Sequence, residues 1–97
     1  MIQGKIKSGF KFKIDERILD DWRVVDAIGL SESTDPSEQT QGARKLVDLI
    51  LGENKQELID FLASKNNGYV PTTAMVSAIA EIITESKELK NSQSSAG

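Results

Sequence analysis

The N-terminal segment alternates apolar side chains with lysines, and this pattern restricts the fold more than any other feature. The alternation covers residues 2–14 in two short runs around Ser8-Gly9, and a period of two is typical of a half-buried strand. A two-residue loop would mix apolar and lysine side chains on each face, whereas the loop Lys7-Ser8-Gly9 separates them and puts glycine where a left-handed conformation is needed. The sequence therefore predicts a β-hairpin over about residues 2–14, with the cross-strand pairs Ile2–Ile14, Gly4–Phe12 and Ile6–Phe10.

This hairpin is not expected to be stable by itself. Two strands are only marginally stable in water, so the apolar face must be covered by helices or by another chain. The outer edge of the hairpin remains available for pairing.

Helical periodicity and capping signals follow the hairpin. Asp15 can cap a first helix, and Asp35-Pro36-Ser37-Glu38 combines a capping aspartate with a proline at the first helical position and a glutamate three residues after the cap. Asn54 with Glu57 repeats the capping pattern, and Asn67-Gly68 is a stop signal. The predicted fold class is α+β, mainly α: the hairpin is followed by four helices at about residues 16–28, 36–51, 54–66 and 72–89.

The length fits one small domain, which we place at residues 1–90. Residues 91–97 carry no side chain able to anchor them, and we expect a flexible, disordered tail there. No apolar run approaches the roughly 18 residues of a transmembrane helix, and the N-terminus lacks the apolar stretch of a secretion signal. A cytosolic protein without membrane contact is expected.

The composition argues against most enzyme classes. The chain has no cysteine and no histidine, which removes thiol nucleophiles, imidazole acid–base chemistry and the usual zinc sites. Neither a nucleophile elbow nor a phosphate-binding glycine loop occurs. We expect no catalytic residue, no cofactor and no metal. An acidic cluster in the loop, Glu32, Asp35 and Glu38, does not have the spacing of a calcium loop, and capping already accounts for Asp35 and Glu38.

Charge is distributed unevenly. Residues 1–13 carry four lysines and no acid, and residues 15–60 carry twelve acids against five bases, a net charge of −7. The overall charge of −3 argues against nucleic-acid binding. Trp22 and the hairpin phenylalanines are candidates for base stacking, but their spacing on the apolar face favours the core instead.

The helices carry more apolar residues than one inward stripe requires. In the second helix, Val47 and Leu51 are displaced around the axis from Leu46, Leu49 and Ile50. In the fourth helix, Val76, Ala80 and Ile83 form a second stripe. Either a four-helix arrangement buries these wide faces, or a partner covers them. The candidate partner-binding residues are Val47, Leu51, Val76, Ala80 and Ile83.

The order of these elements resembles the tail assembly chaperones of long, non-contractile-tailed bacteriophages and prophages, especially those of Gram-positive hosts. The resemblance spans roughly residues 6–86. It departs from the family at Lys11 and Lys13, because acids are associated with those positions. The matching segments include Ser8-Gly9-Phe10-Lys11-Phe12-Lys13-Ile14-Asp15, Leu19-Asp20-Asp21-Trp22, Leu46-Val47-Asp48-Leu49-Ile50-Leu51-Gly52 and Gly68-Tyr69-Val70-Pro71.

The resemblance implies a non-enzymatic chaperone that binds the phage tape measure protein and keeps it soluble while tail-tube protein polymerises around it. It also implies a site of action in the host cytoplasm and absence from the mature virion. In this family a ribosomal frameshift often adds a second domain thought to recruit tail-tube subunits, and the tail from Asn91 suits such a junction. Homo-oligomerisation through the hairpin edge or a spare helical stripe is a further expectation.

An alternative of a different class is a small acidic regulatory protein, such as an antirepressor or a toxin-neutralising partner. Its net charge of −7 over residues 15–60 would then mimic nucleic acid. A structural subunit of the virion is a third alternative, but the chain lacks the strand content expected of a tube-forming protein.

Overall fold

The N-terminal hairpin forms with the predicted register. In the computed structural model, which describes the backbone of residues 1–96 and the side chains of residues 1–91, strands β1 (Ile2–Lys5) and β2 (Lys11–Ile14) pair antiparallel. Ile2 lies opposite Ile14 and Gly4 opposite Phe12. Gly9 adopts a φ of 107°, the left-handed conformation that the three-residue loop needs. The turn chemistry and the strand period together therefore determine the pairing.

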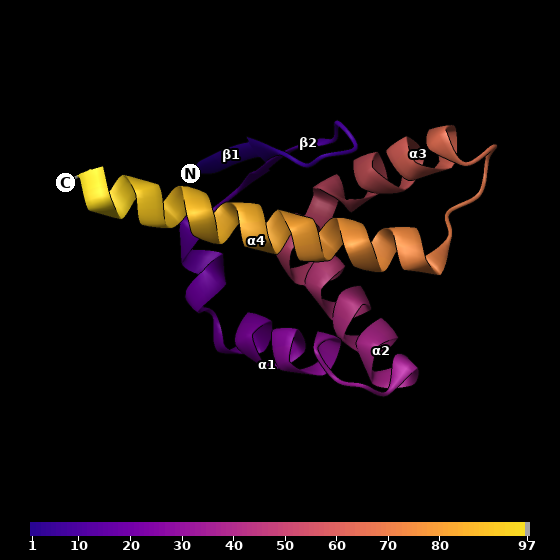
Figure 1. Cartoon of the computed structure of the whole chain (residues 1–97), viewed down its shortest axis with the longest axis horizontal. Helices are drawn as coiled ribbons and strands as arrows, with labels where there is room; N and C mark the ends of the chain where they lie inside the picture. The colour runs from indigo at the N-terminus through magenta and orange to yellow at the C-terminus, as the bar shows by residue number, and fades with distance from the viewer. Residues whose placement is uncertain (97) are drawn as a thin grey trace.

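The apolar face of the hairpin packs on the long helix α4 (Thr72–Ala96), which crosses the whole molecule (Figure 1). At Gly4, an added Cβ atom would lie 2.7 Å from the Phe12 ring of the hairpin and 3.0 Å from Leu89 of α4. Glycine at this point allows β1 to lie against both side chains. The expectation that helices cover the hairpin is confirmed.

The predicted first helix is wrong in its boundaries, because the segment contains a break at Asp21. The 3-10 helix η1 (Glu16–Asp20) is capped by Asp15, and α1 (Trp22–Ser31) begins after Asp21. Asp21 has extended backbone angles, and its carboxylate accepts a hydrogen bond from the Arg23 N–H at 2.8 Å. A side chain that satisfies the first free N–H groups of a helix starts a new helix instead of continuing the old one.

The break also changes which side chains of α1 face the core. Val24 and Ala27 are fully buried, whereas Trp22 is 78% exposed and Val25 is 46% exposed. The predicted burial of Trp22 is therefore wrong. The hairpin phenylalanines, in contrast, are buried as predicted.

Helix α2 (Pro36–Leu46) begins as predicted, with Pro36 in its first turn and the Asp35 carboxylate accepting the Ser37 N–H at 2.9 Å. A π-helical segment, η2 (Val47–Leu51), extends it to the predicted end. Gly52 ends the segment with a φ of 51°. Val47, Ile50 and Leu51 are all buried, at the three- and four-residue spacings that place side chains on one side of a helix.

Helix α3 (Lys55–Lys65) follows a short 3-10 turn, η3 (Gly52–Asn54). Asn54 occupies the predicted cap position, but its side chain forms no capping hydrogen bond within the described residues, so that part of the prediction is wrong. The helix ends at Lys65, and the predicted stop signal follows it at Asn67 and Gly68, which both have positive φ.

Helix α4 begins at the predicted position, but its backbone continues to Ala96, beyond the predicted end near residue 89. Gly97 and the side chains of residues 92–97 lie outside the described residues, so the flexibility expected of residues 91–97 stays a prediction.

One hydrophobic cluster joins the elements. In Figure 1, α4 runs between the hairpin and α3 on one side and α1 and α2 on the other. The cluster takes buried residues from each strand and helix in turn, among them Ile2, Phe12, Leu19, Val24, Leu46, Leu58 and Ile79.

Within the described residues, no helix combines the length and the apolar character that a membrane-spanning helix requires.

Candidate protein-binding surfaces

The five predicted partner-binding residues do not form one surface. Val47, Leu51 and Ile83 are 6%, 5% and 7% exposed, so the monomer itself already covers them. Val76 is half-buried and Ala80 is exposed.

Val76, Ala80 and Ile83 nevertheless line one groove, which we call the α4 groove. Its volume is about 180 Å³, and its opposite wall consists of residues from α1 and α2. The predicted second stripe thus lines one wall of a partly open apolar depression over successive turns of α4. The lining residues are Ile28, Ser31, Glu32, Ala43, Leu46, Val76, Ile79, Ala80, Ile83, Thr84 and Lys87.

The largest exposed apolar side chain in the described part belongs to Trp22, at the first position of α1. Val25 lies three residues further on, so both side chains project from the same side of the helix. Trp22 also borders a depression of about 380 Å³ together with Leu49. We call Trp22, Val25 and Leu49 the tryptophan patch.

Charges of both signs surround the tryptophan patch. Arg23, Asp26, Lys45 and Asp48 line the same depression. Asp48 is paired with Lys55 at 2.8 Å, so part of this rim is already neutralised. An apolar centre with a mixed polar rim is the usual anatomy of a protein-binding site.

The position of Trp22 follows from a local repeat that sequence reasoning missed. Asp15-Glu16-Arg17 and Asp21-Trp22-Arg23 are two Asp-Xaa-Arg turns, and each aspartate caps the helix that follows it. This repeat could have been recognised in the sequence. Two capping turns so close together indicate two separate helices, and the second helix then turns a different set of side chains toward the core.

The geometry of these turns lowers the pKa of both carboxyl groups to about 2. For Asp15 the cause is first the hydrogen bond from the Arg17 side chain, at 2.7 Å, and then the Arg17 backbone N–H. For Asp21 the corresponding donors are the side chain and backbone N–H of Arg23. The two aspartates therefore remain charged throughout the ordinary pH range.

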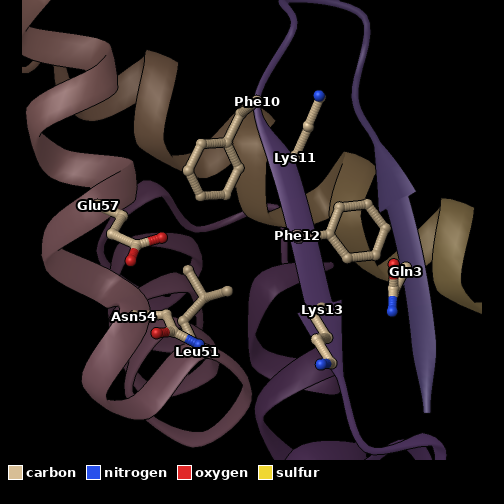
Figure 2. Close-up of a pocket in the computed structure, with 8 residues that line it drawn as sticks. All are labelled: Gln3, Phe10, Lys11, Phe12, Lys13, Leu51, Asn54 and Glu57. Atoms are coloured by element: carbon tan, nitrogen blue, oxygen red, sulfur yellow. The ribbon is translucent and has the colours of Figure 1, made fainter.

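A third depression, which we call the β2 groove, lies between β2 and the start of α3 and extends across β2 to Gln3 of β1 (Figure 2). Its volume is about 310 Å³. Figure 2 shows β2 on one side, Asn54 and Glu57 on the other, and Leu51 between them. Phe10 points from the strand toward α3, where its ring lies 5.5 Å from that of Phe61.

The acidic loop residues take part in local hydrogen bonds. Asp35 caps α2, and Glu38 accepts the Ser33 hydroxyl at 2.8 Å. Among the described residues, no group of three histidine, cysteine, aspartate or glutamate side chains is arranged to hold a metal ion.

Comparison with known proteins gives no family assignment. No family model matches the chain, and neither a curated protein nor a solved structure matches it.

Proposed function

We propose that this protein is a non-enzymatic tail assembly chaperone that binds a phage tape measure protein and keeps it soluble during tail-tube assembly. The observation that carries the proposal is the tryptophan patch, in which Trp22 is 78% and Val25 is 46% exposed. Leaving a large aromatic side chain in water sacrifices the stabilisation that its burial would give, which is typical of a residue that a partner covers.

The patch suits a helical client. A tape measure protein is a long helical chain with apolar faces, and an amphipathic helix binds by placing its apolar side on an exposed hydrophobic surface. Aromatic side chains such as Trp22 are frequent anchors in such contacts. The rim charges Arg23, Asp26 and Lys45 can pair with either sign on the polar side of the client.

The α4 groove supplies a second apolar contact for the same client. It contains Val76, Ala80 and Ile83, the stripe that the sequence gives as candidate partner-binding residues. Several weak contacts on one chaperone, and several chaperones along one client, together hold a long chain more firmly than any single contact.

The acidic segment supports the chaperone over a nucleic-acid mimic. Asp15 pairs with Arg17, Asp21 with Arg23 and Asp48 with Lys55. Asp20 pairs with Lys90 of α4 at 3.0 Å. A mimic needs a row of negative charges free to meet a nucleic-acid-binding protein, and these four carboxylates each have a cation of their own chain beside them.

The remaining expectations from the resemblance are also part of what we propose. The protein acts in the host cytoplasm, is absent from the mature virion and associates with further copies of itself. A longer frameshifted form, continuing beyond α4, recruits tail-tube protein.

Co-expression with the tape measure protein of the same phage or prophage tests the proposal. We expect the client in the soluble fraction with the wild-type protein and in the insoluble fraction with the variant Trp22→Ser/Val25→Ser. Because both side chains are exposed, the variant should keep the melting temperature of the wild type. The matched control is Tyr69→Ser, which removes an exposed aromatic side chain from the loop before α4.

Two results contradict the proposal. One is a client that stays insoluble with the wild-type protein. The other is a client that is solubilised equally by the wild-type protein and by the Trp22→Ser/Val25→Ser variant.

A further inference from the structure

The outer edge of β2 presents backbone groups that no described residue uses. The Ile6 N–H donates to the Phe10 carbonyl at 3.0 Å, which identifies Ile6–Phe10 as a hydrogen-bonded pair of the ladder. Hydrogen-bonded pairs alternate along antiparallel strands, so the N–H and C=O groups of Lys11 and Lys13 point away from β1. Such an edge can accept one more strand.

The β2 groove gives an added strand room beside this edge. It has a volume of about 310 Å³ and lies between β2 and the start of α3. Side chains of neighbouring strands that are directly opposite each other lie on the same face. A residue opposite Phe12 would therefore lie on the side of Phe12 and Leu51, two of the apolar residues that line the groove.

Charge decides which strand fits. Lys11 and Lys13 are exposed on the other face of β2, and residues 1–13 hold four lysines and no acid. A second copy pairing through β2 would bring its own Lys11 and Lys13 against these, and like charges opposite each other destabilise a sheet. Glu57 also lines the groove, but it lies on α3, across the groove from β2.

We propose that β2 binds an extended acidic segment of a partner protein by strand addition, with acidic residues opposite Lys11 and Lys13 and an apolar residue opposite Phe12. The recognised pattern is acidic–apolar–acidic. The backbone groups of Lys11 and Lys13 provide affinity, the lysine side chains select acids, and the groove selects an apolar side chain between them. This surface is separate from the tryptophan patch, and the inference does not depend on the chaperone function.

The test uses the synthetic peptide acetyl-Ser-Glu-Val-Glu-Val-Glu-Ser-amide and the full-length protein, followed by NMR. We expect peptide addition to slow hydrogen exchange of the Lys11 and Lys13 amides and to shift their resonances. The same peptide with lysine in place of glutamate should bind at least about tenfold more weakly, because cross-strand attraction becomes repulsion.

Variants identify the charges responsible. Lys11→Glu/Lys13→Glu should weaken binding of the glutamate peptide by about tenfold or more. The matched control, Lys45→Glu/Lys87→Glu, changes the net charge equally at exposed lysines of other surfaces and should change binding by less than about twofold. Circular dichroism checks that both variants fold, and Lys11→Gln/Lys13→Gln provides a neutral pair of intermediate affinity.

Three results overturn the inference. The first is that saturating peptide leaves exchange of the Lys11 and Lys13 amides unchanged. The second is equal weakening by the β2 variant and by its matched control. The third is protection of these amides that rises with protein concentration in the absence of peptide, because a second copy would then be the occupant.

Discussion

At the scale of single residues, the two Asp-Xaa-Arg turns make the stability of the protein sensitive to acid. The pKa of Asp15 and Asp21 falls from 3.8 to about 2 on folding, because each carboxylate accepts hydrogen bonds from an arginine two residues later. A folded-state pKa below the unfolded value contributes stability that is fully present above the unfolded value. That contribution is lost as the pH falls toward the folded value.

We therefore expect the melting temperature to fall between about pH 4 and pH 2, the window set by the two pKa values. The variant Asp15→Asn/Asp21→Asn should show a shallower fall over that window, as measured by thermal unfolding. The control Asp26→Asn/Glu53→Gln removes two exposed carboxylates that form no ion pair within the described part of the chain. Equal slopes for the two variants would contradict this assignment.

Single residues also explain why the tryptophan was misplaced by sequence reasoning. Apolar spacing from Ile18 to Ile28 is compatible with one continuous helix, and in that helix Trp22 faces inward. The hydrogen bond between the Asp21 carboxylate and the Arg23 N–H outweighs that pattern locally and restarts the helix. Periodicity cannot reveal such a restart, whereas the repeated Asp-Xaa-Arg sequence does.

At the scale of elements, helices α1 and α2 are tightly packed at Gly42. A Cβ atom added there would clash with the backbone N of Ser31 and would lie 2.8 Å from the carbonyl oxygen of Ala27. Both obstacles are backbone atoms of α1, so the helices must separate to admit a methyl group. Gly42 is therefore the residue that sets the spacing of this helix pair.

Gly42→Ala should lower the free energy of unfolding by about 1–3 kcal/mol, the usual cost of overpacking. Gly29→Ala is the matched control, because it is exposed on α1 and an added Cβ would meet nothing within 4 Å. The control should raise stability by about 0.5–1 kcal/mol through the better helix propensity of alanine. Urea unfolding measures both changes, and a neutral effect of Gly42→Ala would show that the helices separate without cost.

The elements differ in how far the sequence determines them. The register of the hairpin was predictable because a shift of one residue would turn every apolar side chain to the wrong face. The start of α2 was predictable because Asp35 and Pro36 carry strong local signals. The π turn at Val47–Leu51 was not, because no local sequence signal marks it.

The candidate site was predictable only in part, for the same reason. The stripe of Val76, Ala80 and Ile83 was identified from spacing, and these residues do line a common groove. The tryptophan patch depends on the relative rotation of α1 and η2, which local periodicity does not specify.

At the scale of the whole molecule, α4 connects the two halves of the fold. It contacts β1, η1, α2 and α3. Two polar contacts reinforce the apolar ones: the Lys7 N–H donates to Glu81 at 3.0 Å, and Lys90 pairs with Asp20 at 3.0 Å. The hairpin therefore depends on residues from the other end of the chain.

A chain ending at Glu88 should lose stability first in the hairpin. It lacks Leu89, which packs beside Gly4, and Lys90, which pairs with Asp20. Loss of a partly buried leucine should lower the free energy of unfolding by about 1–2 kcal/mol. Hydrogen exchange should accelerate most at the β1 amides, whereas a chain ending at Asn91 should match the wild type. Uniform acceleration across α1, α2 and the hairpin would contradict this local dependence.

The position of α4 also affects how the protein folds as the ribosome makes it. Strand β1 is translated well before α4, the helix that covers it. In a nascent chain, the apolar face of the hairpin therefore stays exposed to water until α4 has left the exit tunnel. Slow or stalled translation before α4 would prolong the time during which this face is exposed, and would favour aggregation of the unfinished polypeptide.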